Sequence, residues 1–166
     1  MGDQAEKAIT EKEILEIALK IERDGMAFYK GLCERTTNPE AKTFLHAMTK
    51  EETLHEAQLK ILFQARDHKI FEKGNKDALS EFIKANFQTD IFPDINKIFD
   101  PSSEFESLQK AIDFAIDAEN TSKEFYAMLG EYCDDFEAKT ALVLLEKAET
   151  EHLKRIMEIK NHLFKE

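Results

Sequence analysis

The chain has few residues that interrupt helices and no run that could cross a membrane. Among 166 residues there are only five glycines and three prolines, so long uninterrupted helices are permitted. It contains no stretch of about 18 consecutive apolar residues, which a membrane-spanning helix would need. The N-terminal segment is polar and acidic and lacks the apolar core of a secretory signal. We therefore expect a cytoplasmic protein with no membrane partner.

Cysteines and basic residues are also scarce. The two cysteines, Cys33 and Cys133, form no CxxC pair, which excludes a zinc ribbon, a rubredoxin-type iron site and a thioredoxin-like redox motif. Lys and Arg number 23 against 34 Asp and Glu, which gives a net charge of −11. Binding to nucleic acid needs clustered Lys or Arg, so we expect no nucleic-acid partner. An acidic surface suits cations, although it is often simply solvated.

The sequence contains an internal repeat. Residues 14–62 align without a gap on residues 111–159, an offset of 97, with 15 of 49 positions identical. The segment EAKT occurs at 40–43 and again at 137–140, and KEETLH at 50–55 corresponds to KAETEH at 147–152. In the same way IERDGMAFY at 21–29 corresponds to AENTSKEFY at 118–126. We interpret residues 1–166 as one domain built from two copies of a helix pair.

Capping signals and periodicity predict four long helices, over residues 11–36, 39–70, 104–132 and 136–164. The predicted N-terminal caps are a Thr10–Glu13 box, Asn38 before Pro39, a Ser103–Glu106 box, and Asp134 or Asp135. The connection inside each pair is short, so the two helices of a pair are antiparallel. The predicted fold class is therefore all-α, an antiparallel four-helix bundle.

The segment 71–103, which links the two pairs, differs in character. It holds two prolines and five phenylalanines, and a short helix is predicted over 76–87. A linker of this length needs a structural reason, and a crossover along the bundle supplies one. The phenylalanines would then pack on the outside of the bundle. Such a crossover places Cys33 and Cys133 at opposite ends, and because a disulfide needs Cα atoms within about 7 Å, we predict none between them.

An alternating three- and four-residue spacing defines a core-facing seam of apolar and small residues along each predicted helix, and a Glu or a Glu-x-x-His interrupts each seam near its middle. The four seams run from Leu15 to Leu32, from Ala41 to Leu62 with seven residues, from Ile112 to Leu129 with six, and from Ala138 to Ile159. The residues at these interruptions are Glu22, Glu52 with His55, Glu119, and Glu149 with His152. The i, i+3 spacing places each Glu-x-x-His pair on one helix face. Burying a carboxylate costs on the order of several kcal/mol, and four at one level also repel each other. Two divalent cations bridged by Glu52 and Glu149 would balance these charges, and carboxylates with one His per ion suit iron or manganese.

The same residues also allow plainer interpretations. A single Glu-x-x-His on an acidic helix is usually a surface feature. Two copies in register with two further seam glutamates, however, match the ligand set of di-iron and di-manganese helix bundles. Tyr29 and Tyr126 follow the seam glutamates by two helical turns and either pack in the core or hydrogen-bond to a ligand carboxylate. Glu51, Glu56 and Glu151 lie off the seam and are expected to be solvated.

The segments IERDGMAFY with EETLH, and AENTSKEFY with ETEH, resemble the rubrerythrin family in its form without a rubredoxin domain. The resemblance covers the four long helices and implies a ferritin-like bundle with two iron ions, for which manganese or zinc could substitute. It implies a homodimer that reduces hydrogen peroxide in oxidative-stress defence, with electrons from a separate donor such as a rubredoxin. By the same resemblance Tyr29 and Tyr126 hydrogen-bond to the iron ligands, which are Glu22, Glu52, His55, Glu119, Glu149 and His152.

Two other functions stay open. Peroxide-reducing rubrerythrins carry a carboxylate one turn after the ligand of the third helix, and their ligand exchange depends on it; here that residue is Ser122. A ferritin-like ferroxidase that uses dioxygen is therefore the first alternative. Against a bacterioferritin-like storage cage, Thr53 stands where the haem-ligating Met would, and only 14 residues follow His152, which leaves no room for a fifth helix. The second alternative is a metal-free helical interaction module, which metal analysis would distinguish from the other two.

Overall fold

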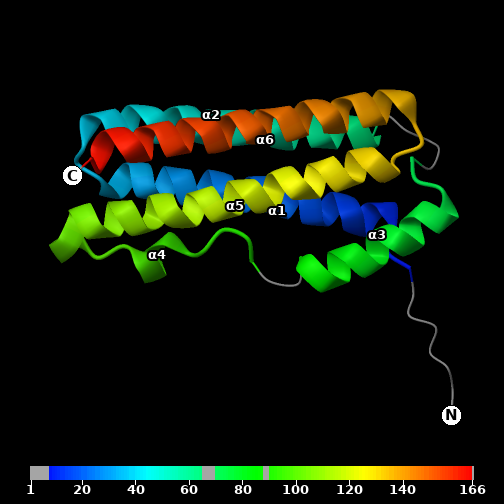
Figure 1. The fold of residues 1–166 in the computed structure, drawn as a ribbon, viewed down its shortest axis with the longest axis horizontal. Helices are drawn as coiled ribbons and strands as arrows, with labels where there is room; N and C mark the ends of the chain where they lie inside the picture. The colour runs from blue at the N-terminus through cyan, green and yellow to red at the C-terminus, as the bar shows by residue number, and fades with distance from the viewer. Residues whose placement is uncertain (1–7, 65–69, 88–89, 166) are drawn as a thin grey trace, which may run out of the picture.

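The computed structural model describes residues 8–64, 70–87 and 90–165 and is built around four long helices (Figure 1). These are α1 (Glu11–Arg35), α2 (Pro39–Gln64), α5 (Glu104–Tyr132) and α6 (Phe136–Leu163). The helices α1 and α2 pair along their lengths, as do α5 and α6, and further contacts join α2 to α6 and α1 to α5. The expected all-α four-helix bundle is thus confirmed. None of the described helices is long and apolar enough to cross a membrane.

The helices begin largely where the capping signals predict. The Thr10–Glu13 capping box is complete, since each side chain accepts a hydrogen bond from the other residue's backbone N–H. Asn38 caps α2 by accepting from Ala41 N, at 2.9 Å. Asp135 rather than Asp134 caps α6 through Ala138 N. These local bonds satisfy backbone donors that a helix start would otherwise leave unpaired.

Ser103 is the N-cap residue of α5, as predicted, but the predicted capping box does not form. The side chain of Ser103 makes no capping hydrogen bond, because a 3₁₀ turn over Pro101–Ser103 leads directly into the helix. Asp100 caps that turn instead, by accepting a hydrogen bond from Ser102 N. The carboxylate of Glu104 accepts hydrogen bonds from Thr37 N and Oγ1, and so joins the start of α5 to the α1–α2 turn.

The connection between α2 and α5 runs the length of the bundle, as expected (Figure 1). It contains α3 (Lys73–Asn86), which begins three residues before the predicted helix, and the unpredicted short α4 (Ile95–Ile98). The predicted helix 39–70 ends at Gln64; residues 65–69 lie outside the described residues, and Ile70 is not helical. There the carboxylate of Glu11 accepts hydrogen bonds from Ile70 N and Phe71 N, which holds the chain across the end of α1 instead of in a helix.

Aromatic residues of this crossover pack against the bundle, as predicted. The ring of Phe92 is buried against Phe28 and Tyr29, with centroid separations of 5.6 and 5.7 Å. Phe87 packs on Phe125 at 4.9 Å. The crossover therefore covers the face formed by α1 and α5. Cys33 and Cys133 are both free, and the prediction of no disulfide between them is confirmed.

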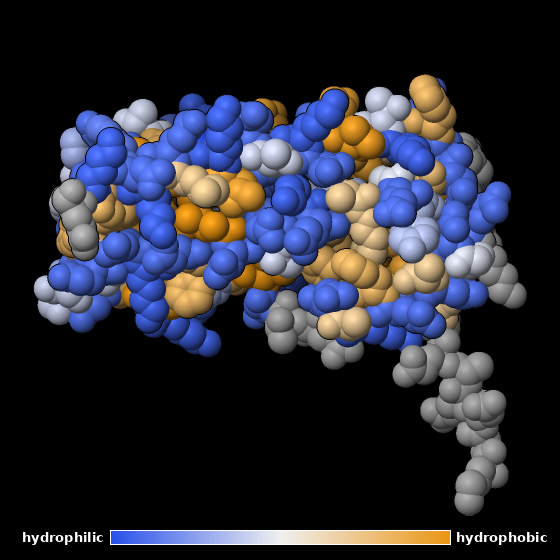
Figure 2. Space-filling view, viewed as in Figure 1, coloured by the Kyte–Doolittle hydropathy of each residue, from blue (hydrophilic) through white to orange (hydrophobic). Residues whose placement is uncertain are grey.

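The predicted seams form the core of the bundle. All seven seam residues of α2 and all six of α5 are buried, including the glutamates and His55. On α1 the buried residue of the first turn is Ile14 and not the predicted Leu15, and on α6 Ile159 is only half-buried. The face shown in Figure 2 is mostly hydrophilic with small apolar patches, as suits a chain that buries its apolar seams inward.

The close approach of α4 to α1 depends on Gly31, and this generates a first prediction. A Cβ at Gly31 would lie 2.7 Å from Ile95 Cγ2, whereas a Cβ at Gly130 would meet nothing nearer than 3.7 Å. We expect Gly31→Ala to displace α4 and lower the free energy of unfolding by about 1–3 kcal/mol. Gly130→Ala, the matched control in α5, should raise it by up to about 1 kcal/mol through helix propensity. Urea unfolding of the chelator-treated proteins measures both; equal effects of the two substitutions would contradict the packing argument.

Candidate metal centre

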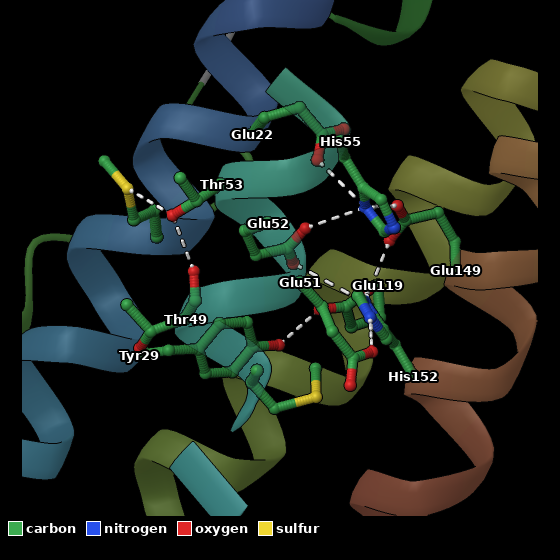
Figure 3. Close-up of polar contacts among 12 residues, drawn as sticks. Glu22, Tyr29, Thr49, Glu51, Glu52, Thr53, His55, Glu119, Glu149 and His152 are labelled. Carbon is green, nitrogen blue, oxygen red and sulfur yellow. Dashed lines mark hydrogen bonds and ion pairs between the residues drawn. The ribbon is translucent and has the colours of Figure 1, made fainter. Parts of the chain in front are cut away.

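The six seam residues singled out by the sequence converge at one level in the middle of the bundle. Each of the four long helices contributes, because the interruptions occur near the middle of all four seams. Five of the six residues are at most 2% exposed and His55 as a whole residue is 7% exposed. The residues that meet there are Glu22, Glu52, His55, Glu119, Glu149 and His152 (Figure 3).

Three carboxylates surround the Nδ1 atom of His55. Glu149 Oε1 lies 3.0 Å away, Glu52 Oε2 3.1 Å and Glu22 Oε2 3.3 Å. Glu52 belongs to the same helix as His55, while Glu22 comes from α1 and Glu149 from α6. One imidazole nitrogen and three carboxylate oxygens thus enclose a first position.

The second position repeats this arrangement around His152. Its Nδ1 atom lies 3.4 Å from Glu119 Oε2, 3.4 Å from Glu149 Oε2 and 3.6 Å from Glu52 Oε1. Glu52 and Glu149 therefore present one oxygen to each histidine. The two imidazole rings stack with centroids 5.1 Å apart. The site consists of two adjacent positions that share two carboxylates, as the duplicated sequence requires.

The spacing of these atoms suits small divalent cations. Ligand atoms about 2.1 Å from one ion are separated by about 3.0–3.5 Å when they subtend right to tetrahedral angles at it. The separations around His55 and His152 are 3.0–3.6 Å. Ligand atoms of Glu52, His55, Glu149 and His152 all lie within 4.8 Å of one another. Oxygen and imidazole ligands of this kind suit iron or manganese.

Several atoms that face the two positions have no hydrogen-bond partner among the described residues. They are Glu22 Oε2, Glu119 Oε2, Glu149 Oε1 and His152 Nδ1. A buried polar atom without a partner costs about 1–3 kcal/mol, so four at one level need an explanation. Bound cations would supply the missing partner for each of these atoms, and the residues present fit a pair of metal ions.

Burial and mutual contact shift the proton affinities of the cluster. Burial raises the pKa of the Glu22 carboxyl well above its usual value and that of Glu119 to about 7. Burial alone would lower the pKa of His55, but the close carboxylates of Glu149, Glu22 and Glu52 raise it to about 12. The pKa of His152 is raised for the same reason. Without cations the cluster therefore holds protons, which cations must displace.

Both tyrosines make hydrogen bonds to the cluster, which distinguishes between the two roles considered for them. Tyr29 of α1 donates to Glu119 of α5, and Tyr126 of α5 donates to Glu22 of α1. Both rings are fully buried, and burial raises the pKa of each hydroxyl well above 10. The hydroxyls therefore keep their protons. They orient Glu119 and Glu22, the two carboxylates that each face only one of the two positions.

Gly25 and Ser122, which lie one turn after Glu22 and Glu119, are both small and buried. A Cβ at Gly25 would lie 3.1 Å from the ring of Phe92 and 3.4 Å from Glu52 Oε1, so this glycine lets the crossover close over the site.

Sequence reasoning missed one contact of the site. Glu51, expected to be solvated, places Oε2 2.8 Å from His152 Nε2 (Figure 3). It also accepts two hydrogen bonds from Arg155 Nη1. Glu51 directly precedes the seam residue Glu52, and a side chain beside a seam can reach the neighbouring helix. Its place in the sequence was therefore the signal that could have predicted this contact. The carboxylate of Glu56 is also not free in solvent, since it pairs with Arg23 and Lys60. Glu151 is exposed, as expected.

Comparison with known proteins agrees with this geometry. A family model described as Rubrerythrin matches residues 13–160. Among solved structures, a protein of Thermotoga maritima described as ferritin-like and diiron-carboxylate shares the fold, with a TM-score of 0.72 and 23% sequence identity. The match covers 93% of this chain and 96% of that chain. Comparison with curated protein sequences gave no match.

Glu22 and Glu119, which each face one position only, give a prediction about stability. Their substitution should change the free energy of unfolding in opposite directions in the metal-free and the metal-loaded protein. A carboxyl whose pKa is raised on folding lowers stability as the pH rises, from about 4.5 through about 7 for Glu119. Changing Glu22 and Glu119 together to Gln removes this loss, so we expect the metal-free protein to gain about 1–3 kcal/mol per site above pH 7. The metal-loaded protein should lose stability, because an amide is a poor ligand for a hard cation.

The measurement is a pair of denaturant titrations, chelated and loaded with Fe²⁺ without oxygen, on the parent and the double variant. Repeating the chelated titration at pH 5 is the control, because both carboxyls are largely protonated there and the gain should shrink. If the metal-free variant loses as much stability as the loaded one, these two residues serve hydrogen bonding alone.

Proton displacement gives a second prediction for the site. Because the histidines must lose their protons to become ligands, we expect binding of two Fe²⁺ per chain to release at least one proton per ion. Affinity should consequently increase as the pH rises from 6 to 8. Anaerobic calorimetry in buffers of different ionisation enthalpy measures both the stoichiometry and the protons. Saturation at one equivalent, or binding that is independent of pH, would contradict the paired site.

Proposed function

Since the chain belongs to the rubrerythrin family, we propose that it is a non-haem di-iron oxidoreductase that reduces hydrogen peroxide. The observation that carries the proposal is the sharing of Glu52 and Glu149 between two histidines, with unpaired atoms directed at both positions. A site that only stabilised the fold would not leave buried carboxylate atoms without partners. The same observation argues against a metal-free interaction module.

The assignment of ligands follows the geometry. One iron ion would be held by Glu22 and His55, the other by Glu119 and His152, and both by the shared pair Glu52 and Glu149. Each ion, when bound as Fe²⁺, would supply one electron. Two electrons with two protons convert hydrogen peroxide into two water molecules. Manganese or zinc would fit the same ligands, but zinc has no redox chemistry.

The protein's own groups prepare the site for this reaction. The apolar seams above and below the cluster, together with Phe92 over Gly25, keep bulk water away from the reacting atoms. Tyr29 and Tyr126 hold protons at their hydroxyls and fix the orientation of Glu119 and Glu22. Exclusion of water strengthens each of these electrostatic contacts.

Cys33 and Cys133 form no CxxC pair that could hold a rubredoxin-type iron. We propose a separate donor protein such as a rubredoxin, and a homodimer acting in oxidative-stress defence in the cytoplasm. These assignments rest on the family to which the chain belongs.

A second candidate function, oxidation of Fe²⁺ by dioxygen, is favoured by one residue. Ser122 is buried one turn after Glu119, where peroxide-reducing rubrerythrins have a further carboxylate. Without that carboxylate the site has the six ligands alone, as a ferroxidase site would.

Rapid mixing separates the two candidates. The chain loaded with two Fe²⁺ without oxygen is mixed with hydrogen peroxide or with dioxygen at equal concentration, and oxidation of the iron is followed by absorbance. We expect peroxide to oxidise the site at least ten times faster. Dioxygen reacting faster would replace the peroxidase proposal by the ferroxidase. The zinc-loaded chain is the control, since any signal there comes from oxidation of Cys or Met side chains.

A further inference from the structure

The two halves of the repeat differ beside the metal centre. At the offset of 97, Glu22, Glu52, His55 and Tyr29 all have identical counterparts in the second half. Glu51, by contrast, corresponds to Ala148. Arg155, its partner in the structure, corresponds to Gln58 in the first half. The symmetry of the six ligands and the two tyrosines is therefore not shared by Glu51 and Arg155.

The supporting residues form a connected group on one side only. Glu51 of α2 places Oε2 2.8 Å from His152 Nε2, and Arg155 Nη1 lies 2.9 Å from both oxygens of Glu51. The guanidinium of Arg155 in turn lies 5.9 Å from the ring centroid of Phe44 and 3.6 Å from Met48 Sδ. Because these contacts hold Arg155 in place, the carboxylate of Glu51 is fixed as well (Figure 3 shows Glu51 directed at His152).

His55 has no such support. Its Nε2 atom makes no hydrogen bond to any residue of the described part of the chain, and Ala148 stands where a carboxylate would be needed. The side chain of His55 is 8% exposed, against 1% for His152. The imidazole of His152 therefore has one defined orientation and presents Nδ1 to the cluster, whereas that of His55 is held only by the cluster itself.

We propose that Glu51 and Arg155 are positioning residues that make the two metal positions unequal. The position at His152 binds its ion first and more tightly, and the position at His55 binds its ion second and more weakly. A carboxylate that accepts the outer N–H of a ligating histidine fixes its tautomer and raises its basicity, and losing such a partner typically costs 10–100-fold in metal affinity. The inference rests on the proposed function in one respect, that the cluster holds two cations.

The test is an anaerobic titration of the metal-free full chain with Co²⁺, followed by calorimetry and by the visible absorption of the bound ion. The parent should bind two equivalents in separate steps. The shared carboxylates could by themselves weaken a second step, so single-site variants identify the first position. His55→Asn should keep the tight step and lose the weak one, and His152→Asn should do the opposite.

The role of Glu51 is tested with a matched pair of variants. Glu51→Gln should weaken the tight step 10–100-fold, shift its absorption bands and leave the weak step unchanged. Glu151→Gln removes the same charge from an exposed position next to His152 and should change neither step. The double variant Ala148→Glu with Gln58→Arg tests whether affinity can be gained at the other position. It places the equivalents of Glu51 and Arg155 beside His55 and should tighten the weak step.

The outcomes separate this inference from the proposal beneath it. If no Co²⁺ binds to the parent, both fail. If two ions bind but His152→Asn keeps the tight step, or Glu51→Gln weakens both steps equally, only the inequality is overturned. Should the rebuilt double variant fail to fold, as judged by unfolding of its metal-free form, Glu51→Gln against Glu151→Gln still decides.

Discussion

Four glutamates and two histidines occupy one level of a bundle whose other seam positions are apolar or small, and this buried charge constrains the residues around it. It requires partners for every inward-facing atom, which the two tyrosines and the shared carboxylates supply only in part. Aromatic residues of the crossover lie over the α1–α5 face and so deprive this charge of solvation by water, which makes those partners more necessary. Charged residues at core positions lower the stability of the metal-free bundle, and such a departure from an apolar core is typical of a functional site.

Features that depend on local periodicity could be predicted from the sequence. The seam of α2 is buried residue for residue as the spacing indicates, because one helix fixes which side chains share a face. The duplicated Glu-x-x-His indicated the site for the same reason, together with the repeat. The Thr10, Asn38 and Asp135 caps are equally local.

Features that depend on contacts between distant segments could not be predicted. Whether Glu51 faces solvent or His152 depends on the rotation of α6 against α2, which no periodicity within α2 reports. Ile70, predicted to be helical, instead donates its N–H to Glu11, which is far away in sequence. Ser103 offered a good capping box, but the preceding turn held by Asp100 took its place. In the first two cases a contact between distant segments decided the outcome, and at Ser103 a competing local turn did.

The crossover between α2 and α5 has a consequence for how such a protein can change over time. If each helix pair were a separate chain in a two-fold dimer, every substitution would appear twice and both histidines would keep identical surroundings. Because the crossover joins the two pairs covalently, each half carries its own sequence. The carboxylate of Glu51 could then arise beside His152, while the corresponding residue of the other half, Ala148, carries none. The linker is thus what permits two equivalent halves to specialise.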